Sequence, residues 1–348
     1  MATLIEAFAA YLPPRLRSLP WRAHPLDGKL LLFERNTGLN VLLEGDETQH
    51  LRRAAPRTLL IAVTNACNLT CGFCYRDLQS RSLWRYDTLL EFCQQADQWG
   101  VLEVAFGGGE PMLFPHWQDF LCELYKTTQL GINFTTNGLL LTETFLYSVA
   151  GCYGQIRVSL YDNNCWSKTV ALLARCQARF GVNWLITPEE LKTLETKFIQ
   201  LLNLGVRDFL FLSYKGNTSP GLHLTPADCR TLSDSINRIH THWGHRVQIK
   251  LDICWGNTLS KVPRLFETGD CEAGNDFLSI TSDRCIKPCS FHHIGIPFET
   301  IYDVQNYWQR QRQVQRAALL KGCARLPNRG LVEGGMTHDA LIHLATVQ

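Results

Sequence analysis

The sequence predicts an α/β protein built around an open parallel sheet. Between Thr58 and about Ser213, short apolar or β-branched runs alternate with longer segments of helical periodicity, the pattern of repeated strand–helix units. The chain has 348 residues and is 45% hydrophobic, so it can bury a large core. Six strand–helix units are two fewer than a closed barrel needs, and we therefore predict a partial (β/α)6 barrel of the TIM type.

Short runs rich in Val, Ile, Leu and Phe predict the strands. They span residues 58–64, 102–106, 131–136, 155–160, 182–187 and 208–213. Apolar residues at three- and four-residue spacing predict the helices, several of which begin with Asp, Thr, Ser or Pro. They span residues 87–100, 116–130, 142–150, 166–180, 189–204 and 227–240.

The segments before and after the barrel, which we assign to residues 58–245, differ from it in character. Residues 1–57 contain two apolar runs around Arg35-Asn36-Thr37-Gly38, which predicts an N-terminal β-hairpin appendage. This hairpin could cover the barrel mouth or offer an edge to an added peptide strand. Residues 246–348 contain cysteines, turns and a helical stretch at 303–320, so we expect a smaller C-terminal unit and tail there.

Charge and hydropathy argue against several classes of partner. The 34 Lys and Arg residues nearly balance the 32 Asp and Glu residues, and the formal net charge of +2 predicts no general attraction to nucleic acid or to an anionic membrane. No apolar run approaches the roughly 18 residues of a membrane span. Glu6 interrupts the only apolar stretch near the N-terminus, so we expect no signal peptide and a cytoplasmic protein.

Three of the 14 cysteines lie in one loop directly after the first predicted strand. Cys67, Cys71 and Cys74 have the spacing C-x3-C-x2-C. A 4Fe-4S cluster held by three local thiolates leaves one iron free to bind another molecule. Structural zinc usually takes four ligands from paired C-x2-C units, and this loop offers no obvious fourth ligand. The motif favours an iron–sulfur cluster, with zinc or simple packing as the alternatives.

Glycine or polar residues follow the next three predicted strands as well, in residues 107–110, 135–138 and 159–162. Because the carboxyl ends of parallel strands meet at one edge of a sheet, these segments should form one rim. Consecutive glycines allow a ligand to approach the backbone closely, and a neighbouring carboxylate can accept hydrogen bonds from an ammonium group. The dinucleotide fingerprint G-x-G-x-x-G is missing, and each segment alone could be an ordinary turn.

Together these motifs resemble the radical SAM superfamily, in which a C-x3-C-x2-C loop after the first barrel strand holds a 4Fe-4S cluster that binds S-adenosylmethionine. The resemblance covers about residues 58–213. It implies that Cys67, Cys71 and Cys74 ligate the cluster and that Phe73 lies near the adenine. It also implies that the methionine amino group is bound by Gly108, Gly109 and Glu110, and that further cofactor contacts come from Thr136, Asn137 and Ser159.

In this superfamily, an electron from the reduced cluster cleaves the cofactor to methionine and a 5'-deoxyadenosyl radical, which abstracts a hydrogen atom from the substrate. The resemblance therefore implies an enzyme that uses a reductant such as flavodoxin or ferredoxin. Because the cofactor carries the difficult chemistry, the protein orients the reactants and excludes water, and no catalytic residue is implied beyond the cluster ligands.

The C-terminal cysteines resemble the start of a SPASM or Twitch extension. Cys271, a predicted strand–turn–strand and Pro288-Cys289 follow that pattern, although Arg284 stands where the consensus has glycine. The further cysteines of a full SPASM domain are absent from the sequence, so the resemblance implies one auxiliary cluster. Its expected ligands are Cys271, Cys289 and Cys323, with Cys285 or Cys254 completing the set. A zinc site or buried thiols are the alternatives.

Radical SAM proteins with such an extension most often act on peptides. The resemblance therefore implies a ribosomally made precursor peptide as substrate, which would be cross-linked, epimerised or shortened by excision of a residue. The first 57 residues are too few for a complete leader-recognition domain, so we expect a separate leader-peptide recognition protein. Two alternatives stay open: the same radical chemistry on a metabolite or cofactor precursor, and a non-catalytic zinc or electron-transfer protein.

Overall fold

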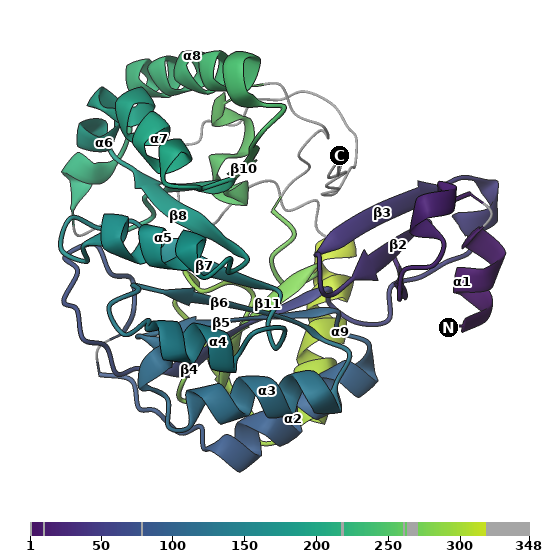
Figure 1. Cartoon of the computed structure of the whole chain (residues 1–348). Coiled ribbons are helices and arrows are strands. Elements are labelled where there is room, and N and C mark those ends of the chain that lie inside the picture. The colour runs from purple at the N-terminus through teal and green to yellow at the C-terminus, as the bar shows by residue number, and fades with distance from the viewer. Residues whose placement is uncertain are drawn as a thin grey trace.

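The computed structural model describes residues 2–9, 11–77, 79–216, 219–259, 262 and 271–317. These residues form a ten-stranded sheet flanked by helices and a separate three-stranded N-terminal sheet (Figure 1). Strands in the large sheet follow the order β10-β9-β8-β7-β6-β5-β4-β11-β12-β13. None of the helices described is both long and apolar enough to cross a membrane.

Seven parallel strands in sequence order form the central part of the large sheet. They are β4 (Thr58–Thr64), β5 (Glu103–Gly108), β6 (Gly131–Thr136), β7 (Gln155–Ser159), β8 (Phe180–Ile186), β9 (Asp208–Ser213) and β10 (Gln248–Leu251). The helices between them are α2 (Tyr86–Trp99), α3 (Trp117–Thr127), α4 (Glu143–Ser148), α5 (Trp166–Arg175), α6 (Pro188–Lys192), α7 (Leu194–Asn203) and α8 (Pro226–Trp243). Within the described residues β10 and β13 are the free edges, so the sheet stays open and the predicted partial barrel is confirmed.

Three elements differ from the prediction in their bounds or number. The helix expected over 166–180 ends at Arg175, and Gln177 has a φ of 54° before β8 begins. The helix expected over 189–204 is divided at Thr193 into α6 and α7. β10 is not among the predicted strands, because its four residues are too few to show a clear alternation.

Threonine side chains determine where several helices begin. In each case the hydroxyl accepts a hydrogen bond from the backbone N–H three residues later, which satisfies a donor that has no partner inside the helix. The capping residues are Thr142 before α4, Thr187 before α6 and Thr225 before α8. Proline occupies the first position of α6 and α8, where its missing N–H breaks no helical bond. The sequence predicted helices that begin at Thr or Pro, and the structure contains them.

Aromatic side chains fix α3 against the middle of the sheet. Trp117 and Phe120 of α3 stack with their ring centroids 5.5 Å apart. Trp117 meets Phe106 of β5 and Phe134 of β6 edge to face, at 5.4 and 5.7 Å. All four side chains are at most 4% exposed. Such pairs each stabilise the fold by about 0.5–1.5 kcal/mol beyond the burial of their area, and they hold β5 and β6 in register.

The C-terminal extension continues the barrel sheet. β11 (Phe277–Ile280) pairs in parallel with β4, and β12 (Cys285–Lys287) and β13 (Ile296–Pro297) follow antiparallel. The strand–turn–strand expected between Cys271 and Cys289 is therefore present. α9 (Ile301–Ala317) lies beside α2, and the rings of Trp99 and Trp308 meet edge to face at 5.5 Å (Figure 1). The sheet thus continues into β10 beside β9 at one side and into β11 beside β4 at the other.

The N-terminal sheet lies at the amino ends of the barrel strands. It contains β1 (Arg22–Pro25), β2 (Lys29–Glu34) and β3 (Leu39–Glu44), and α1 (Ala2–Ala9) precedes it. The predicted hairpin is β2 and β3. In its turn, the Arg35 guanidinium donates to the backbone carbonyls of Tyr125 and Thr128, where α3 ends. The hairpin therefore does not cover the mouth at the carboxyl ends of the strands, and that expectation is wrong.

Short 3-10 helices complete the described chain. They are Pro14–Leu16, Asp46–Thr48, Pro111–Leu113, Pro220–Leu222 and Ile253–Leu259.

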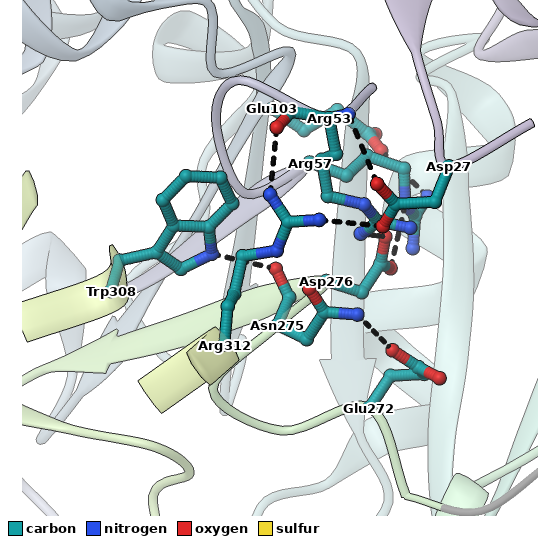
Figure 2. A network of polar contacts seen from close by, with 9 residues as sticks. All are labelled: Asp27, Arg53, Arg57, Glu103, Glu272, Asn275, Asp276, Trp308 and Arg312. Atoms are coloured by element: carbon teal, nitrogen blue, oxygen red, sulfur yellow. Dashed lines mark hydrogen bonds and ion pairs between the residues drawn. The ribbon is translucent and has the colours of Figure 1, made fainter. Parts of the chain in front are cut away.

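A buried polar network joins the N-terminal segment, the barrel and the extension (Figure 2). The Asp276 carboxylate contacts Arg53 at 2.5 Å and Arg57 at 3.0 Å, and Arg57 also contacts Glu103 at 3.3 Å. Burial alone would raise the pKa of Asp276, but Arg57 and Arg53 outweigh it and lower this pKa to about 2. From α9, Arg312 contacts Asp27 at 2.6 Å. The three regions therefore share one set of charged contacts.

Candidate active site at the carboxyl ends of the strands

The three motif cysteines lie in the loop that follows β4. Cys67 and Cys71 are partly buried, Cys74 is exposed, and the Cys74 N–H donates to the Cys71 carbonyl at 3.0 Å. Burial raises the pKa of the Cys71 thiol, and charge on Cys74 and Cys67 raises it further. The Cys71 sulfur therefore lies within electrostatic reach of the other two, and thiolates are suitable ligands for a cationic iron–sulfur core. Among the described residues, no three Cys, His, Asp or Glu side chains surround a single metal position.

The glycines at the end of β5 let its backbone approach the start of the cysteine loop. The N–H of Gly109 donates to the Thr64 carbonyl at 2.7 Å, and the N–H of Glu110 donates to the Ala66 carbonyl at 2.8 Å. A Cβ atom on Gly109 would lie 1.9 Å from the Ala66 carbonyl oxygen, and one on Gly108, whose φ is 108°, would lie 2.5 Å from that of Thr64. Only glycine fits at these two positions, because they hold the chain just before Cys67.

The Glu110 carboxylate joins the ends of β5 and β6. It is 1% exposed and accepts hydrogen bonds from the Thr136 hydroxyl at 2.7 Å, the Asn137 N–H at 2.8 Å and the Met112 N–H at 3.2 Å. Burial raises its pKa, although these three donors oppose the rise. The Asn137 amide in turn donates to the side chain of Asn68, next to the first motif cysteine, at 2.7 Å. Glu110 therefore connects the rim to the cysteine loop.

Phe73 in the cysteine loop and Tyr161 after β7 form an aromatic pair. The rings of Phe73 and Tyr161 are 5.0 Å apart, and the Tyr161 phenol hydrogen-bonds with the Ser159 hydroxyl. Burial raises the pKa of Tyr161 to about 12, and charge on Cys71 and Cys74 contributes to the rise. The predicted contacts Phe73 and Ser159 thus lie at the same end of the sheet as the motif cysteines.

Asn164 and Arg76 are two site residues that sequence reasoning missed. Asn164 is fully buried, and its amide donates to the carbonyls of Asn137 at 2.8 Å and Ser159 at 2.6 Å, so it ties the ends of β6 and β7 together. Its signal in the sequence is the polar run that follows β7. Arg76 donates to the Asn65 carbonyl, and its charge lowers the pKa of the Cys71 thiol, which burial and the other two cysteines raise. The sequence feature that could have identified Arg76 is its position as a cation two residues after the last motif cysteine.

The cysteines of the extension are distributed over three segments. Burial raises the pKa of the Cys254 thiol, and charge on Asp252 and Cys271 adds to this, so Cys271 lies within electrostatic range of Cys254. Cys289 lies near the phenol groups of Tyr75 and Tyr307, whose pKa values are raised by burial and further by the charge of this cysteine. The Cys285 thiol donates to the carbonyl of Asp283 in its own hairpin, at 3.9 Å. The remaining expected ligand, Cys323, lies outside the described residues.

A second aromatic contact bridges the cysteine loop and the extension. The ring of Tyr75, which follows Cys74, lies 4.3 Å from the ring of Phe291. The ammonium group of Lys215, after β9, lies 4.8 Å from the Phe291 ring and forms a buried ion pair with Asp252 after β10. The extension therefore reaches over the same end of the barrel as the motif cysteines.

The comparisons with known proteins agree with this arrangement. Residues 61–160 match the family model described as the Radical SAM superfamily, and this range contains the C-x3-C-x2-C loop, the glycine motif and the rim as far as Ser159. Residues 61–160 therefore carry a radical SAM domain. The resemblance predicted from the sequence is confirmed for this domain, and the predicted fold is confirmed as well.

Relatives that match parts of this chain carry different names. A "Probable GTP 3',8-cyclase" of Methanocaldococcus jannaschii is 34% identical over 92 residues, which are 24% of this chain and 30% of the relative. One of the same name from Methanosarcina mazei is 24% identical over 68% of this chain and 78% of the relative. A "PqqA peptide cyclase" of Gluconobacter oxydans is 36% identical over 25% of each protein. The chain thus aligns with less than a third of the length of the relatives from Methanocaldococcus jannaschii and Gluconobacter oxydans.

Solved structures share the fold at low sequence identity. Streptococcus suis SuiB bound to its precursor peptide SuiA has a TM-score of 0.65 and 15% identity, with 82% of this chain and 88% of SuiB covered. Native anSMEcpe with bound AdoMet has a TM-score of 0.54 and 18% identity, with 69% and 76% covered. Both likenesses extend well beyond residues 61–160, because they cover more than two thirds of the chain.

Proposed function

We propose that this radical SAM protein is an enzyme that cleaves S-adenosylmethionine reductively and abstracts hydrogen from a peptide. Cys67, Cys71 and Cys74 would hold a 4Fe-4S cluster. When bound, the cluster and its cofactor supply the electron for cleavage and the 5'-deoxyadenosyl radical. The observation that carries this proposal is that the loop with these three thiols, the glycine motif and the Phe73–Tyr161 pair lie together at one end of the sheet.

The rim residues would bind and orient the cofactor. The faces of Phe73 and Tyr161 suit a planar adenine, because flat aromatic groups stack on one another. Gly108, Gly109 and Glu110 would receive the ammonium group of the methionine moiety, since a carboxylate attracts a nearby cation even while its oxygens accept other bonds. Further cofactor contacts would come from Thr136, Asn137 and Ser159.

The extension would hold one auxiliary iron–sulfur cluster. Its ligands would be Cys271, Cys289 and Cys323, with Cys254 or Cys285 as the fourth. The proximity of Cys254 and Cys271 supports Cys254 for that role. In this proposal residues 1–57 form an appendage, residues 58–245 the radical SAM barrel and residues 246–348 the auxiliary-cluster region. We place the protein in a reducing cytoplasmic compartment, with which the lack of disulfide bonds among the 13 described cysteines is compatible.

A ribosomally made precursor peptide is the substrate class that we favour, with cross-linking, epimerisation or residue excision as the outcome. The likeness of fold to SuiB, which was solved with a precursor peptide, and the match to a PqqA peptide cyclase support this class. A separate leader-recognition protein and a flavodoxin or ferredoxin would be its partners. The hairpin lies away from the cysteine loop, so it gives no direct route for a leader peptide to that loop.

A nucleotide or another small metabolite is the second candidate substrate. The relative from Methanosarcina mazei that carries the name of a GTP 3',8-cyclase matches 68% of this chain, which is more than the PqqA peptide cyclase matches. The buried ion pair of Lys215 and Asp252 at the same end of the barrel supplies a cation that a phosphate could compete for.

The radical chemistry is tested by anaerobic purification, iron and zinc analysis, and a dithionite assay for 5'-deoxyadenosine. We expect about eight irons per chain, falling to about four in the Cys67→Ala/Cys71→Ala/Cys74→Ala variant with complete loss of the nucleoside. Cys176→Ala, at the end of α5, is the matched control and should keep both. Stoichiometric zinc without any 5'-deoxyadenosine would overturn the proposal.

The substrate class is tested separately by mass spectrometry. Candidate precursor peptides are co-expressed with the wild type and with Cys71→Ala, and a mass change that only the wild type produces supports a peptide. Purified enzyme is incubated in parallel with GTP. Consumption of GTP without any peptide change would favour the metabolite alternative.

A further inference from the structure

A polar cavity lies between the N-terminal hairpin and the amino ends of the barrel strands. Its volume is about 190 Å³. Four cationic side chains and one carboxylate line it together with the amide of Asn40; they are Arg35, Arg57, Arg179, Lys250 and Glu103. The hairpin, the strand starts and the segment before β8 supply these residues, so the cavity is remote from the cysteine loop. Nothing in the proposed radical chemistry uses it.

Two of the four cations are paired with carboxylates. Arg57 contacts Glu103 at 3.3 Å and also Asp276 at 3.0 Å, within the network of Figure 2. Lys250 contacts Asp208 at 2.6 Å, and that carboxylate also pairs with Arg157 at 2.9 Å. At this end of the barrel, the cationic side chains therefore outnumber the carboxylates that pair with them.

The other two cations make no ion pair within the described part of the chain. Arg35 donates to the carbonyls of Tyr125 and Thr128 and lies 3.9 Å from the centre of the Tyr125 ring. Arg179 donates only to the carbonyls of Asn36 and Thr37 in the hairpin turn. An anion in the cavity would balance both guanidinium groups.

Glycine residues keep the cavity open. A Cβ atom on Gly38, whose φ is 65°, would lie 2.6 Å from the Arg179 guanidinium. A Cβ atom on Gly131, at the start of β6, would lie 2.7 Å from the ring of Phe33. Arg179 is the exposed member of the lining, so a ligand can reach the cavity from solvent on that side.

The amide of Asn40 belongs to the closed part of the cavity wall. Its nitrogen donates to the Gly38 carbonyl at 2.9 Å, which fixes the orientation of the amide. Its oxygen is buried and has no hydrogen-bond partner among the described residues. Because this oxygen has almost no accessible surface, the cationic side chains determine which ligand suits the cavity.

We propose that this cavity binds a tetrahedral oxyanion, of which phosphate is the type. Its negative oxygens accept hydrogen bonds from Arg35 and Arg179, whose planar guanidinium groups match two oxygens at once. The bound anion would fasten the hairpin, which carries Arg35 and Asn40, to Arg179 before β8.

The test measures thermal unfolding of the full-length, anaerobically purified protein with sodium phosphate, sodium sulfate or sodium chloride at equal ionic strength. We expect phosphate and sulfate each to raise the Tm in a saturable way by several degrees. Chloride should give no saturable shift. A phosphate effect no larger than that of chloride would overturn the proposal.

Variants assign the effect to this cavity. Arg35→Gln and Arg179→Gln should each weaken phosphate binding about tenfold, because each removes a charged hydrogen-bond donor. Arg230→Gln, at an exposed position of α8, is the matched control and should bind phosphate like the wild type. Circular dichroism shows whether each variant is folded, and calorimetric titration gives the affinity of any that unfolds early. Unchanged affinity in both Arg35→Gln and Arg179→Gln would exclude this site.

The source of the phosphate group is tested with glycerol 3-phosphate. Weaker binding of this ester than of inorganic phosphate supports the free anion. Tighter binding of the ester would contradict the free anion as the natural ligand and would keep the same residues as a phosphomonoester site.

Discussion

The carboxylate of Glu110 accepts a hydrogen bond from the backbone N–H of Asn137 at 2.8 Å, which connects the end of β5 to the end of β6. The same Asn137 reaches Asn68 in the cysteine loop. Two strands and the loop are therefore held in one arrangement by a single buried carboxylate. If this arrangement preorganises the site, a change at Glu110 should affect cofactor binding more than the overall fold.

Glu110→Gln tests this relationship. The amide that replaces one carboxylate oxygen cannot accept from both Thr136 and the Asn137 N–H, and the loss of one charge-assisted bond costs about 1.5–3 kcal/mol. We expect a lower free energy of unfolding and at least tenfold weaker S-adenosylmethionine binding, measured by urea denaturation and equilibrium dialysis. Glu91→Gln, on the exposed face of α2, should change neither. Unchanged cofactor affinity in Glu110→Gln would show that the buried carboxylate does not organise the site.

Gly109→Ala tests how closely β5 must approach the cysteine loop. The new Cβ atom would lie 1.9 Å from the Ala66 carbonyl oxygen, so the backbone before Cys67 must move. We expect purified Gly109→Ala to hold about four irons fewer per chain than the wild type, because the three thiols no longer meet.

The control for Gly109→Ala is Gly107→Ala in the same glycine run. No atom lies within 4 Å of a Cβ atom built on Gly107. Its iron content should match that of the wild type. If both variants lost iron equally, the glycine run would matter for some reason other than the approach to Ala66.

Local patterns were enough to predict the central strands and helices of the barrel. Runs such as residues 58–64 are buried on both faces and rich in Val, Leu and Ile, so their composition identifies them without tertiary information. β10 lacks this signal, because it has four residues that are all only partly buried. Because the carboxyl ends of parallel strands lie at one edge of a sheet, the sequence could predict that Phe73 and the rim residues lie close together. The contacts of Asn164 could be found only in the three-dimensional structure.

The cavity at the amino ends of the strands could not be predicted from the sequence. Arg35, Arg57, Arg179 and Lys250 lie in four distant segments, and each alone looks like an ordinary surface cation. Only the packing of the hairpin against the strand starts brings them together. Sequence reasoning located the hairpin along the chain but left its docking site open, because no local pattern states which end of a barrel an appendage covers.

His24 on β1 should make the stability of the protein depend on pH. Burial, with a smaller effect of Arg53, lowers its pKa from 6.5 to about 3. The unfolded chain therefore binds a proton between pH 6.5 and 3 that the folded protein does not, and the free energy of unfolding falls as pH decreases through this window. The slope should be about 1.4 kcal/mol per pH unit below pH 6. Asp276 adds to this slope only below about pH 3.8, where its carboxylate becomes protonated in the unfolded chain.

Urea denaturation at pH 7, 6 and 5 measures this slope. His24→Gln should remove most of it, whatever the variant does to the stability at pH 7. His245→Gln, at an exposed position after α8, should leave the slope unchanged. A wild-type slope that persists in His24→Gln would mean that another group takes up the proton.

Arg284 at the turn between β11 and β12 has a φ of 58°, the left-handed region that favours glycine. Its guanidinium donates to the Glu299 carbonyl at 2.6 Å and lies 5.2 Å from the ring of Trp84. These contacts offset the backbone strain of an L-residue at a position where the resembling extensions have glycine. We expect Arg284→Gly to be more stable than Arg284→Ala by about 1–2 kcal/mol, because both lose the contacts and only glycine relieves the strain.

The same pair of substitutions at Arg310, on the exposed face of α9, provides the comparison for urea denaturation. There alanine should be more stable than glycine by about 1 kcal/mol, because the backbone is helical. The order of the two variants should therefore reverse between the two positions. The same order at both positions would mean that the strain at Arg284 is too small to matter, and that the turn tolerates arginine without help from Glu299 and Trp84.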